Sequence, residues 1–155
     1  IKVPRGNIEV RHMTVAPNDS GDKWPLNTGS DYVDALTVVF DKNSSLIERQ
    51  MERAVLAIKM DNSADPEHYE WRFALGGLQY ASGHADYRHD IESQVSADGK
   101  LLTLIINCTE DRAVPGAEEY VDFCFTALRK SKKNGECQIF ESKDPSIGIG
   151  PIRPS

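Results

Sequence analysis

The sequence predicts an all-β protein, an antiparallel β-sandwich of immunoglobulin-like type with one short helix near residues 46–52. Two dipeptides, Asp98-Gly99 and Asn134-Gly135, each separate a pair of strongly apolar segments. Asp-Gly and Asn-Gly readily adopt the positive φ angles of a two-residue turn, so the last third of the chain should form two antiparallel hairpins. Apolar and polar residues also alternate in several other segments, which indicates about five to eight strands in all.

The size and composition are those of one globular domain. The chain has 155 residues, of which 39% are hydrophobic and 27% are charged. Both values lie in the ordinary range for a protein that buries one core. Since there is no internal repeat and no linker-like stretch, residues 1–155 should form a single sandwich domain.

The first strand is expected within residues 6–16. Ile8, Val10 and His12 alternate there with charged residues, which is the period-two pattern of a half-buried strand. The following residues, 17–30, are dense in turn formers and should be a loop.

Two strands with a short helix between them are expected next. Residues 32–41 are apolar on both faces, which indicates a strand at the centre of a sheet. Ser45 and Glu48 have the spacing of a capping box, so a short helix should begin at Leu46. Alternation over residues 54–60 then favours a strand, although helical spacing in the same stretch leaves a longer helix as the alternative.

Aromatic residues at period two favour a further strand at residues 69–75. Asp65-Pro66 would also suit the start of a helix, which is the alternative. Residues 76–90 should be a glycine-punctuated connection. The last segment, residues 143–155, contains three prolines and should be an extended edge strand or tail, because proline cannot donate to a central ladder.

The C-terminal segment resembles the signature of a known family. Asp144, Pro145 and Ile147 follow the hairpin FCFTALRKSKKNGECQIFES. This arrangement is similar to the end of the bacterial DP-EP family of small proteins, although Gly150 stands where that family has a glutamate. The resemblance covers roughly the last thirty residues. It implies a small β-sandwich with no established activity and no site residues to transfer.

Charge and hydropathy exclude two classes of partner. The formal net charge is -6, and the main basic cluster lies at residues 129–133 beside the Asn134-Gly135 turn. An acidic domain repels phosphate backbones, so no nucleic-acid partner is expected. No stretch has the roughly 18 apolar residues that span a bilayer, so no membrane segment is expected either.

The three cysteines, Cys108, Cys124 and Cys137, have no C-x-x-C spacing. The pattern favours buried thiols in a reducing compartment, which points to the cytoplasm. One disulfide between neighbouring strands, with the third thiol left over, is the alternative.

A polar cluster suggests a metal site as an alternative function. His84, Asp86 and His89 lie close together, with His68 upstream. Imidazole and carboxylate groups bind divalent metals and can activate water for hydrolysis. However, the spacing of His84 and His89 matches neither helical nor strand geometry for one ion, which favours a solvated turn. No cofactor motif is present.

Loop aromatics suggest a second alternative, a carbohydrate-binding domain. Trp24 lies in the expected loop, and Tyr80 and Tyr87 flank another. Sugar rings stack on flat, exposed aromatic side chains. Trp71, in contrast, is expected to be a core anchor.

The leading hypothesis is a non-enzymatic binding or structural module that recognises a protein or another ligand through end loops or a sheet edge. No nucleophile elbow or phosphate-binding loop is present, so the sequence favours a protein that is not an enzyme. The C-terminal strand would also allow a homodimer by strand addition, with Ile147, Ile149 and Ile152 buried against a second copy. The alternative is that this strand folds back on its own sheet.

Overall fold

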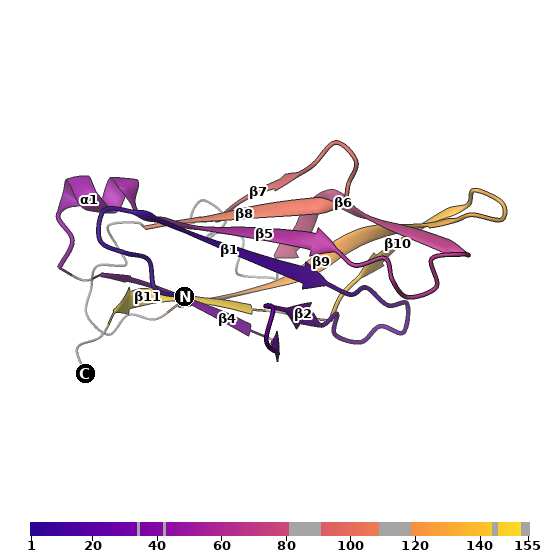
Figure 1. The fold of residues 1–155 in the computed structure, drawn as a ribbon, viewed down its shortest axis with the longest axis horizontal. Coiled ribbons are helices and arrows are strands. Elements are labelled where there is room, and N and C mark those ends of the chain that lie inside the picture. Colours follow the sequence, from indigo (N-terminus) through magenta and orange to yellow (C-terminus); the bar gives the residue numbers. More distant parts are fainter. Residues whose placement is uncertain (34, 42, 81–90, 109–118, 144–145, 153–155) are drawn as a thin grey trace.

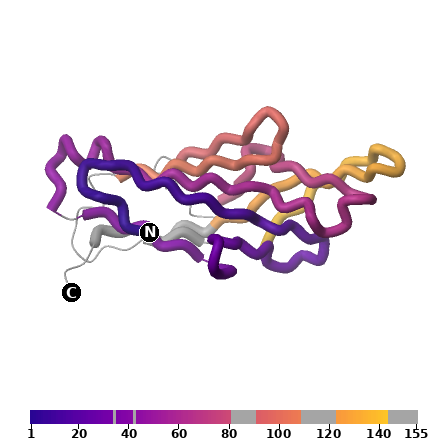
Figure 2. Tube along the Cα trace, viewed as in Figure 1, coloured from indigo at the N-terminus to yellow at the C-terminus, as the bar shows by residue number. Residues whose placement is uncertain are grey.

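The protein is an all-β sandwich with one short helix, as the sequence predicts. The computed structural model describes residues 1–33, 35–41, 43–80, 91–108, 119–143 and 146–152, with the backbone alone for residues 119–122 and 146–152. Two sheets pack face to face (Figures 1 and 2), and buried side chains from both sheets form one core. Within these residues, no helix is long and apolar enough to cross a membrane. The immunoglobulin-like subtype stays a prediction.

The first sheet has six strands in the order β3-β2-β1-β5-β8-β7. Figure 1 shows β7, β8, β5 and β1 side by side along the upper layer. Strands β1 and β5 are parallel, and the other pairs in this sheet are antiparallel. The strands are β1 (Ile8–Val15), β2 (Leu26–Asn27), β3 (Tyr32–Val33), β5 (Arg53–Met60), β7 (Ile91–Val95) and β8 (Leu101–Asn107).

The second sheet is built around one long strand, β9, which pairs with β6 on one side and with β10 and β11 on the other. Strand β4 then pairs with β11 in parallel. The strands are β4 (Ala35–Asp41), β6 (Tyr69–Tyr80), β9 (Glu119–Ser131), β10 (Cys137–Glu141) and β11 (Ser146–Ile152).

Both predicted hairpins are present. The Asp98-Gly99 turn joins β7 to β8, and the Asn134-Gly135 turn joins β9 to β10. The φ angles are 74° at Gly99 and 73° at Gly135, in the left-handed region that glycine tolerates at low cost. The turn chemistry therefore acts as the sequence analysis proposes.

The short helix, α1 (Leu46–Met51), begins with the predicted capping box. The Ser45 hydroxyl accepts from the Glu48 backbone N–H, and the Glu48 carboxylate accepts from the Ser45 backbone N–H. A hydrogen bond from Arg5 and those from Ser45 lower the pKa of Glu48 to about 2. The chain turns into β5 directly after Glu52, so the longer helix is not formed.

The end of α1 is tied to the N-terminal loop by a buried carboxylate. Glu52 is 1% exposed. Its two oxygens accept from the Ser44 hydroxyl at 3.0 Å and from the Gly6 backbone N–H at 3.3 Å. These bonds satisfy a group that would be costly to bury alone.

Two expectations about strands need correction. Residues 32–41 do not form one central strand, because β3 lies at the end of the six-stranded sheet and β4 at the end of the other. Residues 76–80 are not a connection but continue β6 through a bulge, where the left-handed φ angles of Leu75, Gly76 and Gly77 accompany a shift in pairing with β9. Residues 81–90 lie outside the described part.

The C-terminal segment is not an edge strand. Strand β11 lies between β9 and β4 and pairs with both. Its pairing with β9 ends at Ile149, before Pro151, which stands opposite Phe40 of β4. Proline is tolerated because the ladder has already ended on the β9 side. The edge proposed for strand addition is therefore occupied within the chain.

The cysteines are thiols, in agreement with the favoured interpretation. Cys108 and Cys124 are half-buried, but Cys137 is exposed. The expectation that all three are packed in the core is therefore wrong for Cys137, which lies on β10 near the hairpin tip.

Candidate functional site

Trp24 is buried, although the sequence predicts that its ring is exposed in a loop. Trp24 is 3% exposed, and its ring packs edge-on against Trp71 with the centroids 5.8 Å apart. Trp71 is also buried, as predicted, and lies 5.4 Å from Phe140. Trp24 therefore closes one end of the core, and its ring is not available to stack on a sugar.

Tyr80 is half-buried at the end of β6. Its hydroxyl donates to the backbone carbonyl of Ile91 at 3.4 Å, and burial raises the pKa of the phenol. Tyr87 lies outside the described residues. Of the two predicted ligand-binding aromatics that the structure describes, Trp24 is buried and Tyr80 is half-buried, so they do not form one exposed surface.

The proposed metal ligands His84, Asp86 and His89 also lie outside the described residues. His68 is exposed and contacts the Asp65 carboxylate through Nδ1 at 2.5 Å. Among the described residues, no group of three or more His, Cys, Asp or Glu side chains is placed to hold an ion.

A partly buried cation that sequence reasoning missed, Arg129, lies beside the Trp24 region, with its side chain 16% exposed. The Arg129 guanidinium lies 4.1 Å from the Tyr69 ring centroid and 4.8 Å from that of Phe140. It also donates to the Asp19 carboxylate at 2.7 Å. This cation is enclosed by rings and already has a counter-ion, so its role is to fasten the loop around Asp19 to the second sheet.

The surface with most features of a binding site is the outer face of the six-stranded sheet. We use "outer face" for the side chains of β1, β5, β8 and β7 that point away from the core. Val10 and Val55 are cross-strand partners, as are Val55 and Ile105, so these three side chains form an apolar row across the sheet. Val10 is 49% exposed and Ile8, on the same face, is 53% exposed.

This arrangement corrects the interpretation of the first strand. The buried residues of β1 are Met13 and Val15, whereas Ile8, Val10 and His12 face outward. The apolar alternation in β1 therefore marks the outer face rather than the core. Exposed apolar patches of this kind commonly mark interaction surfaces.

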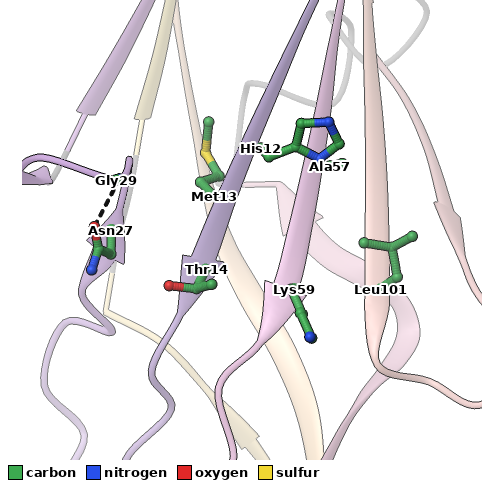
Figure 3. A pocket seen from close by; sticks show the side chains of 8 residues that line it. All are labelled: His12, Met13, Thr14, Asn27, Gly29, Ala57, Lys59 and Leu101. Carbon is green, nitrogen blue, oxygen red and sulfur yellow. Dashed lines mark hydrogen bonds between the residues drawn. The ribbon is translucent and has the colours of Figure 1, made fainter.

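A hollow of about 310 Å³ lies beside the apolar row. Figure 3 shows His12 on β1 next to Ala57 on β5, with Lys59 and Thr14 one row further along. The small side chain of Ala57 leaves space between His12 and Thr103, its partners on either side. The hollow is lined by His12, Met13, Thr14, Asn27, Gly29, Ala57, Lys59 and Leu101.

A second hollow of about 290 Å³ lies on the outer face. It is lined by Glu92, Ser93, Gln94, Thr103 and Ile105. Ala57 of the first hollow and Thr103 of the second are cross-strand partners, so the two hollows lie on neighbouring strands.

Charges on the outer face are separated. Lys59 lies at the first hollow and Glu92 at the second. Within the described part of the chain, the side chains of His12, Thr14 and Lys59 make no hydrogen bond or ion pair, while the Glu92 carboxylate accepts from Asn107 at 3.3 Å. The first hollow thus presents donors that have no acceptor among these residues.

Comparison with known proteins identifies a family but no activity. No curated protein matches the chain. Among solved structures, the cadherin-like domains 1 to 4 of zebrafish RET show a faint likeness, with 6% sequence identity, a TM-score of 0.29, and coverage of 83% of this chain and 30% of that chain. The family model of the DP-EP family matches residues 5–151, far beyond the C-terminal segment in which the resemblance was noted. The chain therefore belongs to the DP-EP family.

Proposed function

We propose that the protein is a non-enzymatic binding module whose binding surface is the outer face of the six-stranded sheet. The single observation that carries this proposal is the apolar row of Val10, Val55 and Ile105, set beside a hollow in which the side chains of His12, Thr14 and Lys59 have no hydrogen-bond partner within the described residues. A rigid sheet with an apolar centre and charged margins has the anatomy of a protein interface.

The binding surface that we propose is a sheet face, and not the end loops or the sheet edge that the sequence suggests. The Trp24 loop is packed against Trp71, and the C-terminal strand pairs on both sides. The outer face needs no rearrangement to meet a partner, because Ile8, Val10 and Leu101 are already exposed on it.

Site-specific photo-cross-linking in bacterial cells that express the full chain tests this proposal. Benzoylphenylalanine replaces Val10, which is 49% exposed on the outer face, or Ile139, which is 50% exposed on β10 of the other sheet. We expect discrete adducts from position 10 and none from position 139. The Ala57→Trp substitution, which fills the first hollow, should remove the adducts from position 10.

The mass of an adduct identifies the kind of partner. Equal adducts from both positions, or none from position 10, would refute the outer face as a binding surface. Adducts from position 10 that contain a different protein would support the proposal as it stands.

A further inference from the structure

We infer that the partner of the outer face is a second copy of this chain, packed face to face about a two-fold axis. This inference rests on the proposed function and adds the identity of the partner. It is drawn from the positions of charged, protruding and small side chains on the outer face.

Two of the charges on the outer face, those of Lys59 and Glu92, are arranged for self-recognition. Lys59 stands opposite Leu101, and Glu92 stands opposite Ile105, so the two charges are separated by two strands and four residues. The centre of the line that joins them falls at Thr103, which lies between them on β8. A two-fold axis in the plane of contact, through Thr103 and perpendicular to that line, exchanges the two positions. Lys59 of each copy then meets Glu92 of the other copy, which gives two equivalent ion pairs.

The same axis brings complementary shapes together. Strands lie about 4.8 Å apart and rise about 3.3 Å per residue, which sets the distances on this face. With these spacings, the axis through Thr103 also passes Val10, so the exposed Val10 side chain meets its own copy. The Ile105 side chain of each copy comes over Ala57 of the other copy. An apolar side chain of each copy therefore lies over the first hollow of the other copy, at the position where Ala57 is small.

The size of the face predicts a reversible dimer. The four strands span about 19 Å at about 4.8 Å each, and seven residues from Ile8 to Thr14 span about 23 Å. A footprint of about 440 Å² per copy lies at the small end of specific interfaces. Association should therefore depend on concentration, with monomer and dimer exchanging in solution.

Charge reversal tests this inference. Sedimentation equilibrium of the full chain should show a monomer–dimer equilibrium. Lys59→Glu and Glu92→Lys should each weaken dimerisation by about a hundredfold, because each places like charges together twice in the dimer. The double variant exchanges the two charges and should return the dissociation constant to within about threefold of the original value.

The control for Lys59→Glu is Lys130→Glu, which makes the same change in net charge at an exposed position of β9 in the other sheet. It should change the dissociation constant by less than about threefold. Far-UV circular dichroism and thermal unfolding confirm that each variant is folded, which is expected because both substituted side chains are exposed.

Each outcome decides between the two proposals. A chain that remains monomeric at every concentration overturns the second copy as partner, and the cross-linking adducts then decide whether the outer face binds another protein. A dimer that the single reversals do not weaken, or that the double reversal does not restore, overturns the Lys59–Glu92 geometry. The geometry is supported only if both single reversals weaken the dimer and the double variant restores it.

Discussion

Replacing Trp71 with alanine should lower the free energy of unfolding by about 3–5 kcal/mol, the range for removal of a large buried aromatic side chain. The indole is 5% exposed and contacts Trp24 and Phe140, with ring centroids 5.8 Å and 5.4 Å away. The Arg129 guanidinium lies 5.7 Å from its centroid. Loss of the ring leaves a cavity at the point where the loop with Trp24, the second sheet and Arg129 meet. Urea unfolding followed by far-UV circular dichroism measures the change.

The matched variant is Trp71→Phe, which keeps an aromatic ring against Trp24 and Phe140. It should cost clearly less than the alanine variant. A loss below about 1 kcal/mol for Trp71→Ala would be typical of a surface position and would contradict the packed arrangement. Near-UV circular dichroism should also change in both variants, because each removes the edge-on pair of two indole rings that Trp24 and Trp71 form.

The second large effect is expected at the first hairpin turn. Gly99→Ala should destabilise the protein by about 2–5 kcal/mol, the sum of the cost of a left-handed φ and of overpacking. A Cβ atom at Gly99 would lie 2.8 Å from the Cβ of Arg72, which has little freedom to move. The Gly99 carbonyl also accepts from the Phe73 backbone N–H at 2.7 Å, so a shift of the turn would weaken its attachment to β6.

Gly135→Ala is the control for this prediction. Gly135 occupies the corresponding place in the second hairpin and has nearly the same φ angle, but nothing lies within 4 Å of an added Cβ. It should therefore cost only about 1–2 kcal/mol, the cost of the left-handed φ alone. Equal losses of unfolding free energy in the two variants would show that the turn at Gly99 does not pack against Arg72.

Local turn and cap chemistry made much of the fold predictable. Asp98-Gly99 and Asn134-Gly135 identify two hairpins because their backbone needs are met within a few residues. The Ser45 and Glu48 capping box identifies the start of α1 for the same reason. Such signals do not depend on distant parts of the chain.

Features that depend on distant residues were not predictable in the same way. The neighbours of β11 are β4 and β9, which lie far from it in the sequence. The residues of β11 itself therefore do not show that this strand lies inside a sheet. The burial of Trp24 likewise depends on Trp71. Turn-forming residues around Trp24 indicate a loop, but they do not show what the loop covers.

The sequence did not reveal the outer face, because the apolar residues that alternate in β1 were expected to face the core. Ile8, Val10 and His12 share one face of β1, and period two cannot tell which face is buried. The available signal was in the neighbouring strands, since Val55 and Ile105 lie among strands that are apolar on both faces. An apolar second face indicates that either another layer of the protein or a partner covers it. The strand register, which the sequence does not give, places Val55 and Ile105 in line with Val10.

Solvent paramagnetic relaxation with a soluble gadolinium chelate tests most directly whether a second copy covers the outer face. Methyl groups of Val10, Ile105 and Ile139 in the full chain are compared at low and high protein concentration. The proposed dimer predicts that the relaxation enhancement of Val10 and Ile105 falls as concentration rises, while that of Ile139 on the other sheet stays constant. Enhancement that is unchanged at all three methyl groups, or that falls at Ile139 alone, would contradict it.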